Sequence, residues 1–209
     1  GNKMKTLLSL LLLATLQVSL LAEVQLSSLF NDGAILQRNT KVPVWGWAPS
    51  GTEVSVSFKG QNKTTKADAN GKWTVKLDAL KASAESAQMT IKVGAESKTL
   101  NDILVGEVWV CGGQSNMDFR LSMLTGKARN PKNEPLAEYI RKEIATANDP
   151  LLRQIKVSRK ISPLKTVDNF TGAWEKAIPQ QVGNFTATGY FYARELRKEL
   201  GIPVGLVNC

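Results

Sequence analysis

The sequence contains no histidine among its 209 residues. A serine hydrolase activates its nucleophile with a base, most often a histidine, so no Ser–His pair can form within these residues. Two cysteines, Cys111 and Cys209, are too few for a disulfide framework, and each ends an apolar stretch where small buried thiols are common. We therefore expect free thiols. No cluster of metal-ligating residues is visible, and we expect neither a metal nor a cofactor.

The chain also lacks a basic stripe, although its formal net charge is +9. Its lysines are spread along the sequence and are not interleaved with aromatic residues, as a nucleic-acid-binding surface would require. The charge pattern favours a solvated basic surface and no nucleic-acid partner. A mild attraction for anionic substrates stays open.

Residues 1–22 read as a signal peptide, with three residues before the expected start at Met4. Lys5 precedes a short apolar run that polar residues interrupt, and Ala22 offers a small residue for cleavage. The run is shorter than a good membrane-spanning helix, although an uncleaved anchor is the alternative. We expect an exported protein with no stable membrane span after cleavage. The periplasm or the outside of the cell is favoured, and the lysosome is the alternative in a eukaryote.

Residues 23–104 read as an all-β region. Apolar and polar residues alternate along Thr52–Phe58, Trp73–Leu77 and Met89–Val93, which predicts strands with one face in a core. Asn70-Gly71 is a type I′ turn signal, and we expect it to join a strand over Gln61–Ala67 to the strand at Trp73 in a hairpin. Short alternating strands at this spacing predict a small antiparallel β-sandwich.

From residue 105 onward the pattern changes to that of a parallel α/β sheet. Val108–Cys111 is almost continuously apolar, as in a strand covered on both faces, and Ile202–Val207 is a second such stretch. Gly189–Leu200 reads as a helix, with Gly201 at the position of a C-terminal cap. We also expect a helix over Leu136–Ala147 and an extended segment over Lys156–Val167.

Ser115 follows the first of these strands and is the candidate nucleophile. Gly112 and Gly113 let the chain turn sharply, and the Ser115 N–H could then donate to the oxyanion of a tetrahedral intermediate. The segment lacks the G-x-S-x-G elbow, the dinucleotide-binding glycines and the P-loop lysine. The alternative is that Ser115 only caps a helix, with Asp118 completing a capping box.

Three ordered segments resemble the bacterial and animal sialate O-acetylesterase family of the SGNH (GDSL-like) hydrolase superfamily. Gly106–Met117 is similar to its nucleophile block. The other matching stretches are Phe30–Arg38 followed by Val42–Ala48, and Phe185–Leu196 followed by Ile202–Val207. The resemblance implies a β-sandwich followed by a flavodoxin-like three-layer α/β domain over residues 105–209. It also implies hydrolysis of O-acetyl esters of sialic acids or other sugars, with an acetylated sugar or sialoglycan as the partner.

The same resemblance implies that Ser115 is the nucleophile and contributes its N–H to the oxyanion hole. Gly113, Gln114 and Asn116 would shape the turn. The family's later glycine-rich block, its asparagine and its Asp-x-x-His motif are missing here. We therefore expect the N-terminal, incomplete portion of such an enzyme, a poor catalyst with an exposed apolar sheet edge.

The alternative to an esterase is a non-catalytic glycan-binding module. Its support is three tryptophans in the β-rich region, which could stack on sugar rings: Trp45, Trp47 and Trp73. The alternation around Trp73 favours core packing for these side chains instead.

Overall fold

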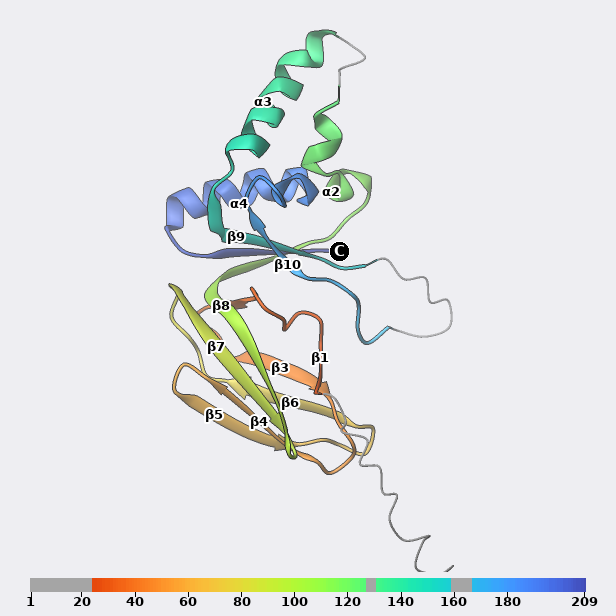
Figure 1. Cartoon of the computed structure of the whole chain (residues 1–209), viewed down its shortest axis with the longest axis vertical. Helices are drawn as coiled ribbons and strands as arrows, with labels where there is room; N and C mark the ends of the chain where they lie inside the picture. The colour runs from red at the N-terminus through yellow and green to blue at the C-terminus, as the bar shows by residue number, and fades with distance from the viewer. Residues whose placement is uncertain (1–23, 127–130, 159–166) are drawn as a thin grey trace, which may run out of the picture.

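The computed structural model describes residues 24–126, 131–158 and 167–209. The expected signal peptide lies outside the described residues. Figure 1 shows a β-rich part at the bottom, a central sheet above it, and the helices at the top. Among the described residues, no helix is long and apolar enough to span a bilayer.

Two sheets build the β-rich part. The smaller sheet is antiparallel and contains β1 (Gln25–Leu26), β3 (Val42–Trp47) and β6 (Lys72–Leu77). The larger sheet contains β4 (Glu53–Phe58), β5 (Gln61–Lys66), β7 (Ser83–Val93) and β8 (Glu96–Cys111), and β2 (Ile35–Gln37) pairs with β8. Along β6 exposed and buried residues alternate strictly, as predicted, and its buried Trp73, Val75 and Leu77 join one core with Val56 and Ile91 of the larger sheet.

The predicted hairpin at Asn70-Gly71 is wrong. β5 pairs with β4 through a turn at Lys59 and Gly60, whose φ angles are +43° and +79°, the positive pair that a type I′ turn needs. β6 pairs with β3 in the other sheet, so the segment around Gly71 crosses between sheets. The Asp68 carboxylate accepts the N–H groups of Asn70 and Lys72 and holds this crossing turn.

The central sheet has the order β10-β9-β11-β8. β8, β11 (Val204–Asn208) and β9 (Asp149–Lys156) are parallel, and β10 (Trp174–Ala177) is antiparallel to β9. The helices are α2 (Ser115–Asp118), α3 (Glu134–Thr146) and α4 (Ala187–Leu200), with short 3₁₀ turns η1 (Leu121–Leu124), η2 (Pro131–Asn133) and η3 (Val182–Asn184).

Side chains of the central sheet alternate between two cores. Leu152 and Leu206 pack with α3 and α4, whereas Ile155 and Val207 pack with the β-rich part. The central sheet therefore has helices on one face and the β-rich part on the other (Figure 1). A mixed α/β fold is confirmed, and the flavodoxin-like three-layer arrangement stays a prediction.

β8 runs without interruption through the predicted boundary at residues 104–105, so one strand serves both regions. Arg153 of β9 ties the regions together, because its guanidinium donates to the carbonyls of Gly33 and Asp102 at 2.7 Å each. It also contacts the Asp102 carboxylate at 3.0 Å, which Lys176 approaches from another side at 2.8 Å. The division into domains stays a prediction, with a strand rather than a linker at the junction.

Local predictions for the helices are largely confirmed. α4 ends at Gly201, whose φ of +66° and N–H bond to the Arg197 carbonyl form the expected cap. In α3, Ile140 is buried, whereas Leu136 is 52% exposed. Of the extended segment predicted over Lys156–Val167, Lys156 is the last residue of β9 and Val157 and Ser158 lie outside any strand. Residues 159–166 lie outside the described part of the chain, so the prediction is not tested there.

The prediction that Val108–Cys111 is covered on both faces is wrong. Trp109 is 40% exposed and Val110 is 71% exposed. Beyond Gly106, β8 pairs with β11 on one side, and no strand of the described residues pairs with its other edge. Trp109 packs edge-on against Tyr192 of α4, with 5.1 Å between ring centroids. An exposed apolar sheet edge, as expected from the sequence, is present here.

Candidate active site

The three parallel strands end at one edge of the central sheet. In the register of the sheet, Asn208 of β11 lies beside Cys111 of β8 and Lys156 of β9. Ligands of parallel α/β sheets bind at this carboxyl edge, because the loops that follow the strands gather there. Ser115 follows β8 by four residues and therefore belongs to this edge.

Ser115 is exposed and is the first residue of α2. Gln114 occupies the N-cap position, and its carbonyl accepts the N–H groups of Met117 at 3.0 Å and Asp118 at 3.2 Å. The Ser115 hydroxyl makes no capping bond, so the interpretation of Ser115 as a helix cap is wrong. Its side chain stands at the surface, accessible to a substrate.

The backbone N–H groups at the start of α2 are available as donors. Those of Ser115 and Asn116 donate to no acceptor among the described residues, because the first N–H groups of a helix have no partner within it. Gly112, Gly113 and Gln114 are exposed with the serine. This geometry provides two adjacent donors beside one hydroxyl, which is what an oxyanion site requires.

Helix α4 packs against residues 112–116, the turn that carries Ser115 and is called the serine turn below. A Cβ at Gly189 would lie 3.0 Å from the Cys111 sulfur and 2.5 Å from Thr186 Cγ2, so glycine lets the helix approach the end of β8. Thr186 contacts the Met117 sulfur at 3.5 Å, and the hydroxyl of Thr188 lies 3.5 Å from the Asn116 carbonyl. The turn is thus packed against the sheet and α4 together.

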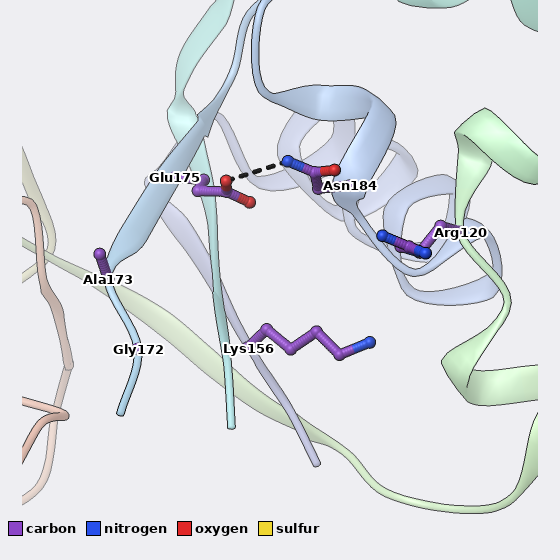
Figure 2. Close-up of a pocket in the computed structure, with 6 residues that line it drawn as sticks. All are labelled: Arg120, Lys156, Gly172, Ala173, Glu175 and Asn184. Atoms are coloured by element: carbon purple, nitrogen blue, oxygen red, sulfur yellow. Dashed lines mark hydrogen bonds between the residues drawn. The ribbon is translucent and has the colours of Figure 1, made fainter. Parts of the chain in front are cut away.

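A cavity of about 340 Å³ opens beside this turn (Figure 2). Its lining comes from the segment after α2, the end of β9, the segment entering β10, and η3: Arg120, Lys156, Gly172, Ala173, Glu175 and Asn184. Lys156 Nζ lies 2.6 Å from Asp118 Oδ1, which links the end of β9 to the last residue of α2. Asn184 donates to the Glu175 carboxylate at 3.1 Å. None of the lining residues was identified from the sequence, because they come from four separate segments.

Two buried amides also lie at this edge. The Gln154 side chain accepts the Thr186 N–H at 2.9 Å and donates to the Asn184 carbonyl at 3.3 Å, joining β9 to the start of α4. Asn208 is 1% exposed, and its Nδ2 has no hydrogen-bond partner among the described residues. The one sequence signal for these buried amides is a polar residue inside an apolar stretch, as at Gln154.

The two thiols are free and are not activated. Burial raises the pKa of the Cys111 thiol, with a further contribution from Cys209, and burial also raises the pKa of Cys209. The Cys209 N–H donates to the Cys111 carbonyl at 3.0 Å. A raised pKa leaves less thiolate at neutral pH, so neither cysteine is activated as a nucleophile.

The tryptophans of the β-rich part serve mainly as packing. Trp73 is 2% exposed within the core, and Trp45 packs edge-on against Phe30 at 4.8 Å between centroids. A cavity of about 150 Å³ lies between Trp45, Trp47 and the Lys72–Asp168 ion pair. In the described part of the chain, no group of three or more potential Cys, Asp, Glu or His ligands could hold a metal ion.

No protein-family model matches the chain. The chain is 26% identical to human sialate O-acetylesterase over 196 residues and 24% identical to the rat protein of that name over 197 residues. Each alignment covers 87% of this chain, and 36% and 34% of the relatives. A crystal structure of a carbohydrate acetylesterase from Xanthomonas citri matches with a TM-score of 0.77 and 38% identity, over 88% of this chain and 40% of that one.

The chain thus spans little more than a third of the length of these relatives. The aligned share of this chain includes most of its described residues, and the structural match covers both the β-rich part and the central sheet because it extends over 88% of the chain. Sequence and structure therefore agree on one relationship. Over most of its length the chain is therefore similar to sialate O-acetylesterases and to this carbohydrate acetylesterase.

Proposed function

We propose that this chain carries the serine nucleophile of a carbohydrate esterase that hydrolyses O-acetyl esters of sialic acids or other sugars. The observation that carries the proposal is Ser115, exposed at the carboxyl edge of the sheet beside two unused backbone N–H groups. The family relationship supports the acetyl ester of a sugar as the substrate class. Gly113, Gln114 and Asn116 shape the turn in this proposal.

In the proposed reaction, Ser115 Oγ attacks the acetyl carbonyl carbon while a base removes the hydroxyl proton. The carbonyl oxygen becomes negatively charged, and the N–H groups of Ser115 and Asn116 stabilise it. Collapse of the intermediate breaks the ester bond, the sugar oxygen takes the proton, and the acetyl group stays on the serine. Water then attacks this acetyl-serine with the help of the same base and releases acetate.

We further propose that the base lies outside these 209 residues, in a longer protein of which this sequence is the N-terminal portion. The absence of histidine and the partial coverage of the relatives support this view. The longer protein would be exported after removal of residues 1–22. It would complete a flavodoxin-like SGNH domain that follows a β-sandwich, and it would cover the open edge of β8.

The test compares Ser115→Ala with a control at Ser122, an exposed serine in η1. In the protein encoded by the complete reading frame, Ser115→Ala should lower kcat/KM for acetate release from O-acetylated sialic acid by about 10⁴-fold or more. Ser122→Ala should leave the rate unchanged. The 209-residue chain alone should be slower than the complete protein by several orders of magnitude. Undiminished turnover in Ser115→Ala would refute the proposal and return the glycan-binding module to consideration.

A further inference from the structure

We propose that the cavity beside the serine turn is a subsite for the carboxylate of an acidic sugar. Arg120 and Lys156 form its cationic wall. The inference rests on the proposed function, because it names the class of sugar that the site would select. Figure 2 shows Arg120 and Lys156 reaching the cavity from two different segments, with Asn184 between Arg120 and Glu175.

Within residues 24–126, 131–158 and 167–209, Arg120 has no ion-pair partner. Lys156 faces Asp118 at 2.6 Å, and the Glu175 carboxylate accepts a bond from Asn184 at 3.1 Å. The Arg120 guanidinium makes no ion pair or hydrogen bond with a described residue. Lys156 has three N–H donors and uses one for Asp118, so two donors remain for a ligand. As far as the described residues show, the cavity therefore offers one unpaired cation and a second whose donors are partly used.

The backbone of Arg120 is held in place before any ligand binds. Arg120 forms an isolated β-bridge with Thr186. On either side, the Ala187 N–H donates to the Phe119 carbonyl at 2.8 Å, and the Leu121 N–H donates to the Phe185 carbonyl at 3.1 Å. A fixed backbone lowers the entropy lost when the guanidinium binds, although the side chain itself is exposed.

The lining matches one kind of ligand. A guanidinium binds a carboxylate through two parallel N–H···O bonds, and the ammonium of Lys156 adds a charge-assisted donor. Across the cavity, the Glu175 carboxylate accepts hydroxyl protons, and Asn184 both donates and accepts. A sugar that bears one carboxylate and several hydroxyls satisfies both sides, whereas a neutral sugar leaves Arg120 unmatched.

The position of the cavity relative to the serine suits one substrate molecule. Asp118, which contacts Lys156, is the last residue of the four-residue helix that Ser115 begins. An α-helix rises by about 1.5 Å per residue, so Ser115 and Asp118 are separated by only about 5 Å along the axis of α2. A carboxylate in the cavity would therefore hold a sugar with its acetyl ester close to Ser115.

The test is an amide NMR titration of the 209-residue chain at low ionic strength with three methyl glycosides. Methyl β-D-glucuronoside and methyl β-D-glucoside differ only in the carboxylate, and the methyl α-glycoside of N-acetylneuraminic acid represents the sialic acids. We expect both acids to shift the amide signals of Arg120, Gly172 and Ala173. The glucoside should bind at least about five-fold more weakly than the glucuronoside, which corresponds to about 1 kcal/mol. Added salt should weaken only the acids.

Variants identify the residues responsible. Arg120→Gln should weaken binding of both acids about five-fold and leave the glucoside unaffected, whereas Arg120→Lys should lie between the two. Lys142→Gln removes one exposed charge on α3, away from the cavity, and should change nothing. Binding of one acid alone would assign the subsite to sialic or to uronic acids, and either result supports the inference.

Equal binding of glucoside and glucuronoside, or undiminished binding of acids to Arg120→Gln, would overturn the inference. Shifts confined to other regions of the chain would do the same. Binding does not require the Ser115 hydroxyl, so Ser115→Ala should titrate as the parent chain does. Acid binding without esterase activity in the complete protein would therefore refute only the proposed function. Esterase activity without acid binding would refute only this subsite.

Discussion

Arg153→Met should be among the most destabilising single changes in the chain. The Arg153 side chain is 3% exposed and lies where β9, β8 and the loop before β2 meet. Besides its bonds to Gly33 and Asp102, its Nε donates to the Pro150 carbonyl at 2.9 Å. Methionine fills similar space without any donor, so three carbonyl groups and one carboxylate lose a partner together.

The expected loss is about 3–4 kcal/mol of unfolding free energy. A hydrogen bond to a charged group contributes about 1.5–3 kcal/mol, and removing one partner of a buried pair costs about 3–5 kcal/mol. Two circumstances keep the value at the lower end of that range. Asp102 retains its contact with Lys176, and its carboxylate is 31% exposed, so water can replace part of what Arg153 supplied.

Urea unfolding followed by circular dichroism measures this effect, with Arg141→Met as the control. Arg141 contacts Glu134 at the surface, with 42% of its side chain exposed, so its loss should cost about 1 kcal/mol or less. A loss below about 1 kcal/mol for Arg153→Met would refute the view that this arginine ties the two regions together.

The same variant should change the response to acid. Burial raises the pKa of Asp102, but bonds from Lys176 and Arg153 outweigh it, and the net pKa is lowered. A carboxylate with a lowered pKa stabilises the fold above its unfolded pKa of about 3.9, and this stability is lost as the pH falls through the folded value. Without Arg153 the pKa of Asp102 should rise toward its unfolded value, so the variant should lose less unfolding free energy than the parent chain between neutral pH and a pH below about 3.9.

Three further predictions concern the surroundings of the serine turn. Gly189→Val should push α4 away from the end of β8 and lower the unfolding free energy by about 1–3 kcal/mol, measured by thermal and urea unfolding; unchanged stability would contradict the close approach. Alkylation with iodoacetamide, followed by mass spectrometry, should label exposed Cys209 well before buried Cys111, and the reverse order would be inconsistent with this structure. The pKa of Glu143 is lowered, because bonds from Arg194 and Tyr190 outweigh its burial. Glu143→Gln should therefore reduce the stability lost between neutral pH and a pH below about 4.3, and an unaltered pH profile of unfolding would argue against these bonds.

Several features of this fold could be determined from local sequence alone. Alternation along Lys72–Leu77 determines which side chains face a core, because successive residues of a strand point to opposite faces. Gly201 ends α4 as predicted, since glycine adopts the left-handed conformation without a Cβ penalty. The serine block, a run of twelve residues, is the most specific of the three segments that carry the resemblance to sialate O-acetylesterases, because a turn of this kind depends on neighbours in sequence.

Other features depended on which segments meet in space. The turn at Lys59-Gly60 carries no strong sequence signal, yet it forms the hairpin, whereas Asn70-Gly71 crosses between sheets because β6 completes the core facing β4 and β7. Val110 is exposed because no element of the described residues covers it, and an apolar residue is buried only if another element does so. The Arg120 cavity joins residues from four segments up to 64 positions apart (120 to 184). The sequence by itself therefore predicted most of the strands and helices and gave Ser115 as the candidate nucleophile. Tertiary packing alone decided strand pairing, the open edge and the charged cavity, because each requires contacts between distant residues.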